Sequence, residues 1–284
     1  MKAFSEKMTL IWPPFFWLLV LFILPILLIL IISFSISQNH GGYELGFTLE
    51  HYAHFFDALY FKIFLRSIGY AISTTVLTLL IAFPMAYYIS FRESHVKYKL
   101  MLLVLIPFWT NFLIRTFSWV NILGYKGLIN NVLMYVGIID SPLILLHTSL
   151  SVNIGLVYSE LPYMILPILA SIDRLDKSLL EASTDLGANK WQTFKNITFP
   201  LSFPGVITGI IFVFIPTLGQ FVVPDILGGK NSYMIGNVIT NQFLVTRNWP
   251  FGSAISISIM VLVLILMIYY LRNYGDRGQI KDFI

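Results

Sequence analysis

Two ionisable residues lie inside long apolar runs of this chain, where a charge is costly. Arg115 is the only charged residue in the run 100–124, and Glu160 is the only one in the run 147–172. At the centre of a membrane such a group costs about 2.5–3.5 kcal/mol on insertion scales, so each needs a partner or a function. Two interpretations stay open: a structural ion pair between Arg115 and Glu160, or binding of a cationic substrate by Glu160.

The positions of these residues along their expected helices permit a pair. At about 1.5 Å per residue, Arg115 lies about 24 Å along an outward-running helix and Glu160 about 18 Å along an inward-running one. In a hydrocarbon core about 30 Å thick, the two depths differ by about 12 Å, which is roughly the combined reach of the two side chains. Spacing alone does not decide between the pair and a substrate site.

Aromatic side chains are a second group that can hold a cation. A ring face attracts an ammonium group by about 0.5–2 kcal/mol and carries none of the desolvation cost of a carboxylate. Aromatic residues in membrane helices also serve as packing or interface anchors, so both uses stay open. The candidates are Phe108, Trp109, Tyr158, Phe221 and Trp249.

A further carboxylate, Asp225, directly follows Pro224 where an expected span reaches its outer side. There it can meet an incoming ammonium group and stay partly hydrated, which avoids the full cost of a buried charge. Alternatively it caps the loop that follows, because Asp often accepts hydrogen bonds from backbone amides two residues further on. Both roles stay open.

The elements that must position these residues are membrane helices. Of the 284 residues, 57% are hydrophobic and 11% are charged, an apolar excess that one globule cannot hide. Uncharged or nearly uncharged runs of about 20 residues can cross the bilayer. A cleavable signal peptide is the alternative for the first run, but its apolar core would be only about 7–15 residues long. We therefore predict an all-α integral membrane protein with one transmembrane domain, 1–284, and six spans at about 12–36, 63–90, 99–123, 148–170, 201–222 and 251–271.

The basic residues predict the orientation of the chain. If the N-terminus is cytoplasmic, twelve of the 18 Lys and Arg residues fall in inside segments. This bias favours both termini in the cytoplasm by the positive-inside rule. The loop 171–200 is then the longest cytoplasmic loop.

Within that loop, the stretch Glu181–Leu201 interrupts the apolar pattern with charged residues and helix breakers. Its spacing predicts two short helices separated by Gly187, which suits the left-handed conformation that ends a helix. Asn189 and Gln192 have the spacing of a capping box for the second helix, and Pro200 is expected to stop it.

The expected helix pair has an acidic face and an apolar face. Glu181 and Asp185 lie four residues apart and can accept hydrogen bonds from a basic partner surface. The apolar face needs a groove to fill, although a helix pair lying on lipid headgroups fits the pattern equally well. The apolar face consists of Trp191, Phe194 and Ile197.

The fifth expected span contains two further signals. Gly205 and Gly209 permit close approach to another helix, either within the bundle or on a partner membrane protein. Further along, Pro216 and Pro224 are expected to break the helix, and irregular backbone is tolerated there only against protein or a wet cavity. The apolar stretch 232–244 that follows is too short to cross and is expected to be a partly inserted helix beside the path.

The loop resembles the EAA motif of bacterial ABC importer permeases, usually written EAA, three residues, G, nine residues, I, two residues, P. The matching residues are Glu181, Ala182, Gly187, Ile197 and Pro200, and the single departure is Ser183 in place of the second alanine. The resemblance implies the type I ABC importer permease fold, also called MetI-like. It also implies that the loop, including Asp185, docks into a cleft of a cytoplasmic ATPase and couples it to the spans.

Four longer segments resemble the spermidine/putrescine branch of these permeases. They are 105–119, 171–188, 234–243 and 248–256. The resemblance implies a bacterial inner-membrane polyamine importer with a second homologous permease, two copies of an ATPase and an extracytoplasmic polyamine-binding protein. Iron, sulfate and molybdate permeases share the loop and remain alternatives, as does a secondary transporter, although the two halves of the chain show no convincing internal repeat.

Several function classes are not supported by the residues. No phosphate-binding G-x-x-x-x-G-K-[ST] motif is present, so ATP is expected to bind a partner. The chain has no cysteine and its five histidines lack ligand spacing, so we predict no metal site and no cofactor. No nucleophile and base stand at a catalytic spacing. The net charge of +4 is spread thinly, which argues against nucleic acid and for the loops of a membrane protein.

Overall fold

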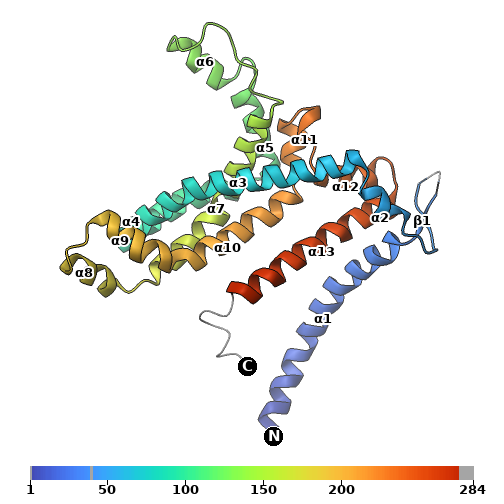
Figure 1. Ribbon diagram of the computed structural model, residues 1–284, viewed down its shortest axis with the longest axis horizontal. Helices are drawn as coiled ribbons and strands as arrows, with labels where there is room; N and C mark the ends of the chain where they lie inside the picture. Colours follow the sequence, from blue (N-terminus) through green and yellow to red (C-terminus); the bar gives the residue numbers. More distant parts are fainter. Residues whose placement is uncertain (1, 39–40, 275–284) are drawn as a thin grey trace. The chain divides into compact units, whose positions relative to one another are not determined.

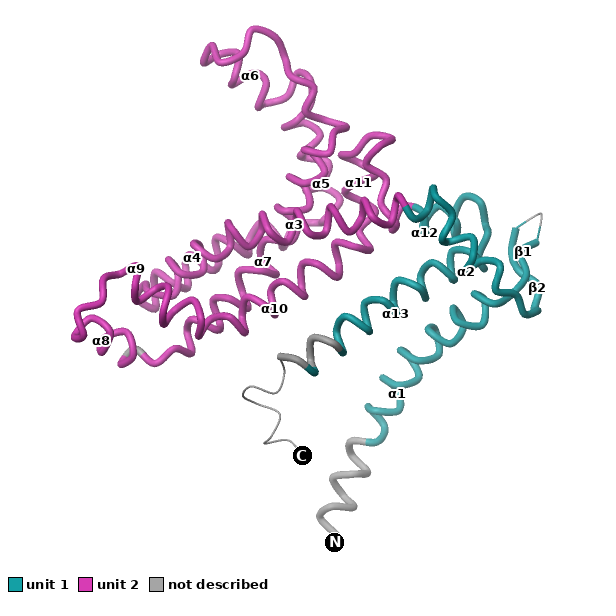
Figure 2. The backbone as a smooth tube through the Cα atoms, in the orientation of Figure 1, with its two compact units in different colours: residues 1–61, 238–284 teal, residues 62–237 magenta. Residues whose placement is uncertain are grey.

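The computed structural model describes residues 2–38 and 41–274, and helices dominate it (Figure 1). Among these residues, five helices are long and apolar enough to cross a membrane, and a bent pair of helices raises the number to six. The predicted all-α membrane fold is therefore confirmed. Residues 1 and 275–284, at the two termini that are predicted to be cytoplasmic, lie outside the described residues. Two compact units make up the chain, unit 1 with residues 1–61 and 238–284, and unit 2 with residues 62–237 (Figure 2).

Unit 1 is built on two long helices that pack against each other, α1 (Lys2–Ser33) and α13 (Trp249–Tyr274). Most large apolar side chains from Trp12 to Ile31 are exposed, as expected for a helix that faces lipid or another subunit. The unit also contains α2 (Glu50–Phe55) and the antiparallel strands β1 (Ile36–Ser37) and β2 (Tyr43–Glu44).

Unit 2 contains the remaining spans and the loop 171–200. Its helices are α3 (Ala58–Ser90, from residue 62 onward), α4 (Ser94–Leu105), η1 (Ile106–Trp109), α5 (Phe112–Leu123), α6 (Leu128–Tyr135), α7 (Ser149–Asp173), α8 (Lys177–Asp185), α9 (Lys190–Thr193), the π turn η2 (Phe194–Thr198), α10 (Phe199–Leu218), α11 (Val222–Leu227) and η3 (Lys230–Ser232). The helix α12 (Ile235–Leu244) begins in this unit and continues into unit 1.

The core of unit 2 lies where α3, α7 and α10 pack together. Its buried side chains include Phe83 from α3, Ile168 from α7 and Val213 from α10. A second apolar cluster joins α3, α7 and α11 further along, with Leu156 and Val223 among its buried members. Burial at these positions holds the three long helices side by side and gives the loop 171–200 a rigid base.

The two glycines of α10 are used for packing against α7. A Cβ atom on Gly205 would lie 2.5 Å from the backbone oxygen of Pro167, and one on Gly209 would lie 2.6 Å from the Met164 sulfur. Only a residue without a side chain permits this approach. The glycine spacing therefore serves contact within the bundle, between α10 and α7.

The segment predicted as a span over 99–123 is broken. Ser94–Trp109 and Phe112–Tyr135 are bent by 91° relative to each other. The bend follows from local chemistry, because the side chain of Asn111 accepts a hydrogen bond from Leu113 N at 2.8 Å and so starts a new helix. This bend changes where Arg115 can reach.

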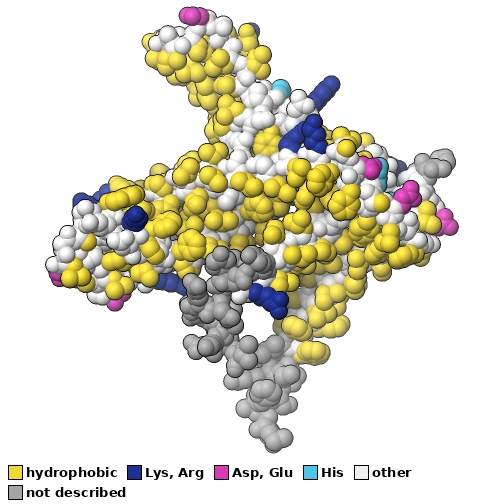
Figure 3. Space-filling view, viewed as in Figure 1, with side chains coloured by type: hydrophobic (Ala, Val, Ile, Leu, Met, Phe, Trp, Pro, Cys, Tyr) yellow, Lys and Arg dark blue, Asp and Glu magenta, His cyan; other side chains and the backbone are white. Residues whose placement is uncertain are grey.

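Hydrophobic side chains cover much of the visible face, and the charged side chains visible there are few (Figure 3). Large exposed apolar residues occur along α3, α7, α10 and α13. A surface of this kind matches lipid rather than water.

Candidate functional site

The loop 171–200 forms a compact elbow, consisting of α8, the turn at Gly187, α9 and η2. Asp176 caps α8 by accepting a hydrogen bond from Ser178 N at 2.9 Å, and this bond lowers the pKa of the Asp176 carboxyl. At the other end, Gly187 has a φ of +82°. Gly187 N donates to Thr184 O at 2.9 Å and Ala188 N donates to Ser183 O at 3.0 Å, the two hydrogen bonds of a Schellman motif. The predicted left-handed end at Gly187 is confirmed.

The start of the second helix is also as predicted. Asn189 and Gln192 cap each other's backbone amides, at 2.9 Å and 2.8 Å. The prediction that Pro200 stops this helix is wrong, since a π turn carries the chain from α9 into α10. Pro200 occupies the first turn of α10, where its missing N–H is not needed, and Phe199 N bonds Phe194 O instead. The elbow is thereby joined directly to a membrane span.

Ser183, the departure from the EAA pattern, ties the two arms of the elbow together. Its side chain is buried, donates to Leu180 O at 2.8 Å and hydrogen-bonds the Thr193 hydroxyl at 2.8 Å. An alanine could pack in the same space but could not make this contact. The serine therefore strengthens the link between α8 and α9.

The outer face of the elbow is free for a partner. Glu181, Ala182, Asp185 and Gly187 are exposed, and the Leu186 side chain is 88% exposed. Neither Glu181 nor Asp185 forms a salt bridge within the described residues. An exposed leucine next to two free carboxylates is typical of a docking surface.

The inner face of the elbow is fixed to the spans. Phe194 packs edge-to-face on Phe83 of α3, with ring centroids 5.6 Å apart. Ile197, also on this face, is half-buried. Nearby in the sequence, just before the elbow, an ion pair between Lys97 and Asp173 joins α4 to the end of α7. Movement of a partner bound to the outer face would therefore reach α3 and α10.

The two charged residues inside the spans do not form the predicted direct ion pair. In the described part of the chain, Glu160 Oε2 and both Arg115 Nε and Nη1 are buried without hydrogen-bond partners. The Arg115 guanidinium lies over the Phe108 ring instead, 4.4 Å from its centroid. The depth estimate assumed one continuous helix over 99–123, and the bend before α5 removes that basis.

An aromatic cluster lies beside the Arg115 guanidinium. Tyr158 of α7 stacks on Phe108 with ring centroids 5.6 Å apart and meets Trp119 of α5 edge-on at 5.5 Å. Glu160, two residues further along α7, is only 4% exposed. The structure thus gathers the partly buried Arg115 guanidinium and three rings from α5, α7 and η1. The buried Glu160 carboxylate lies on the same helix as Tyr158 but on a different side of it, because residues two apart on a helix do not face each other.

Three other aromatic candidates do not join this cluster. Trp109 is 78% exposed on η1, and Phe221 is 42% exposed at the start of α11. Trp249 belongs to unit 1, where the centroid of its ring lies 6.1 Å from that of Tyr43. Trp119 was not among the predicted residues, although its position four residues after Arg115 on one helix face was a signal for it.

Asp225 lies on α11, just beyond the break that ends α10. Its side chain is exposed and accepts no hydrogen bond from the described residues, so it does not cap the following loop. The helix is interrupted at 219–221 rather than at the prolines, which both lie inside helices. Asp225 is therefore a free carboxylate beside irregular backbone.

The start of α12 supports this irregular backbone. Asn237 donates from its side chain to Phe221 O at 2.8 Å, and a Cβ atom on Gly236 would lie 2.4 Å from Gly219 O. Ser67 of α3 accepts from Ile235 N at 2.7 Å. The break is thus held by protein groups, as expected for irregular backbone at membrane depth.

Comparison with known proteins gives a consistent set of relatives. Residues 58–281 match the family described as "Binding-protein-dependent transport system inner membrane component". Over 260 residues the chain is 43% identical to the spermidine/putrescine transport system permease protein PotB of Haemophilus influenzae, with 91% of this chain and 90% of that protein covered. The PotB protein of Escherichia coli is 41% identical over 256 residues, with 90% and 93% covered. A solved bacterial alginate ABC transporter, in complex with an alginate pentasaccharide-bound periplasmic protein, aligns with a TM-score of 0.71 and 19% identity over 98% of this chain and 97% of that one, which is a likeness of fold.

Proposed function

Because the chain belongs to the family of binding-protein-dependent transport system inner membrane components, we propose that it is the permease subunit of an ATP-driven importer of spermidine or putrescine. One observation carries the substrate class, namely the similarity to spermidine/putrescine permeases over about nine-tenths of both chains. The chain is a multi-pass inner-membrane transport protein of the ABC importer permease fold. ATP hydrolysis is proposed to belong to a partner.

The proposed importer has four kinds of subunit. This chain and a second homologous permease form the path, two copies of an ATPase bind on the cytoplasmic side, and an extracytoplasmic binding protein delivers the polyamine. In this arrangement both termini and the elbow are cytoplasmic. The free outer face of the elbow supports ATPase docking there.

The elbow is proposed to couple ATP hydrolysis to the spans. Glu181, Ala182, Asp185 and Gly187 face the ATPase, while Ser183 holds the two arms together. Ile197 and Pro200 lie on the continuous helical connection into α10. A push on the outer face would then move α10 as a unit.

The polyamine path is proposed to include two carboxylates and nearby rings. Asp225 meets the cation at the outer side, Glu160 binds an ammonium group deeper in, and Tyr158 supplies a ring from the same helix. The orphaned Glu160 oxygen supports this role, because a buried carboxylate without a partner is unfavourable until a cation arrives. Trp109 and Phe221 present exposed rings to the same path.

Growth of cells that depend on imported polyamine tests the proposed function. Cells that neither make nor import polyamines should grow on spermidine or putrescine when this chain is expressed with its partner permease, ATPase and binding protein. Omission of this chain alone should remove growth. Rescue of sulfate, molybdate or iron uptake without polyamine uptake would assign the chain to one of the alternative importers.

Replacing Asp225 with asparagine should weaken uptake at low substrate concentration. Asparagine keeps the shape and removes the charge, so the apparent KM for spermidine should rise by about tenfold, as expected for one charge-assisted contact. Asp225→Glu should be milder because it retains the charge. Uptake kinetics in vesicles measure both, with basal ATP hydrolysis as the assembly control. Equal transport by wild type and Asp225→Asn would show that this carboxylate is not on the path.

A further inference from the structure

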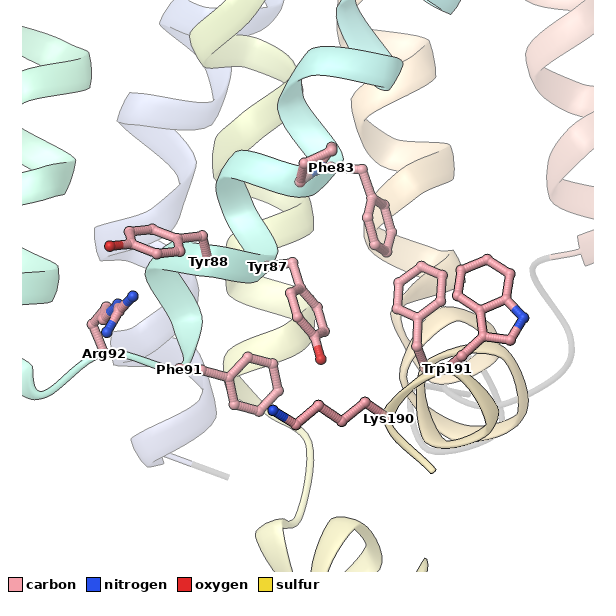
Figure 4. A pocket seen from close by; sticks show the side chains of 9 residues that line it. Phe83, Tyr87, Tyr88, Phe91, Arg92, Lys190 and Trp191 are labelled. Atoms are coloured by element: carbon pink, nitrogen blue, oxygen red, sulfur yellow. The ribbon is translucent and has the colours of Figure 1, made fainter. Parts of the chain in front are cut away.

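A groove lies between the last turns of α3 and the second arm of the elbow (Figure 4). Its volume is about 820 Å³, which is large enough for a ligand of drug or lipid-fragment size. Six of its nine lining residues are aromatic. These are Phe83, Tyr87, Tyr88, Phe91, Trp191 and Phe194.

The aromatic walls are preformed by ring contacts. Tyr87 packs against Phe91 and Phe194, with centroid distances of 4.8 Å and 5.7 Å, and Trp191 stacks on Phe194 at 5.5 Å. Nevertheless Tyr88, Phe91 and Trp191 remain 55%, 48% and 67% exposed. Part of this aromatic surface therefore lacks an apolar occupant among the described residues.

The charge of the groove is positive. Arg92 and Lys190 line it, no carboxylate does, and neither cation forms a salt bridge within the described residues. The Arg92 guanidinium lies over the Tyr88 ring, 4.0 Å from its centroid, and Figure 4 shows Lys190 extending from the elbow toward the end of α3. The neighbouring Glu93 pairs with His95 at 3.4 Å and does not line the groove.

We propose that this groove binds an anionic phospholipid, with its acyl chain against the rings and its phosphodiester on Arg92 and Lys190. The groove begins where a span ends, which is the depth at which headgroups meet acyl chains. A polyamine would be repelled by the two cations, and a free phosphate would leave the rings uncovered. The site is independent of which substrate the importer carries.

Native mass spectrometry of the assembled importer, taken from membranes of phosphatidylethanolamine and phosphatidylglycerol, tests this site. Wild type should retain phosphatidylglycerol more than phosphatidylethanolamine. The double variant Arg92→Gln/Lys190→Gln should retain at least about tenfold less phosphatidylglycerol, as expected for the loss of two charge-assisted contacts. Each single variant should fall between, which keeps the test valid if the double variant fails to assemble.

A matched control removes two exposed positive charges outside the groove, Lys99→Gln/Arg174→Gln. This control double variant should retain phosphatidylglycerol as wild type does. An equal loss of phosphatidylglycerol in both double variants would overturn the proposal in favour of a general headgroup belt. Glycerol phosphate should not displace the bound lipid, and displacement by it would make the site an anion site only. A photo-crosslinker replacing Phe91 should capture lipid, and capture of the partner permease or ATPase would show that a protein fills the groove.

Discussion

Replacing Gly187 with valine is expected to reduce polyamine uptake by at least about tenfold while the protein still inserts and assembles. The φ of +82° at this position costs an ordinary L-residue about 1–2 kcal/mol, and a β-branched residue more. Because nothing lies within 4 Å of a Cβ atom there, the effect would come from the backbone and not from a clash. Valine should therefore misdirect the second arm of the elbow. Binding protein should no longer stimulate ATP hydrolysis, which a coupled ATPase assay measures.

Two companion variants isolate the conformational cause. Gly187→Asn should keep most of the uptake because asparagine tolerates the left-handed region. Gly137→Val provides a matched control, since Gly137 also has a positive φ, +74°, and open space around it, but lies after α6 and outside the elbow. Near-normal transport by Gly187→Val would reduce the elbow to a surface helix pair.

Replacing Glu160 with glutamine is expected to raise the apparent KM for polyamine by about ten- to a hundredfold, the effect of losing one charge-assisted contact of about 1.5–3 kcal/mol. Glutamine keeps the shape of the buried side chain, so the assembled complex and its basal ATP hydrolysis should survive. Uptake measured over a range of spermidine concentrations separates this result from a loss of assembled protein. An unchanged KM would remove Glu160 from the path.

A double variant decides whether Glu160 serves Arg115 or the substrate. If the two charges balance each other through space, Arg115→Gln/Glu160→Gln should transport better than Glu160→Gln alone, because the uncompensated arginine is gone. If Glu160 binds the polyamine, the second substitution should restore nothing. The absence of a direct ion pair in the structure favours the second result.

The elbow could be predicted from sequence because its geometry is local. The cap at Asn189 and the left-handed end at Gly187 depend on residues within five positions of each other. The end at Pro200 was mispredicted for a related reason. A π turn just before the proline removed the need for its N–H, and no residue pattern in the loop announces such a turn.

Contacts between distant segments were harder to predict. The close approach at Gly205 and Gly209 was foreseen as a property of α10, but its partner on α7 came only from the structure. The prediction of an ion pair between Arg115 and Glu160 was wrong because Asn111 starts a new helix and redirects α5. The aromatic groove joins the end of α3 to residues about a hundred positions later, so nothing local indicated it.

ATP-driven uptake of labelled spermidine and putrescine into proteoliposomes tests the proposed function most directly. The vesicles would hold this chain with its partner permease and ATPase, and the binding protein would be added outside. Accumulation of polyamine that requires both ATP and the binding protein, and that excess sulfate, molybdate or ferric iron does not reduce, is the predicted result. Uptake that proceeds without ATP and binding protein, or transport of one of those ions in place of polyamine, would contradict it.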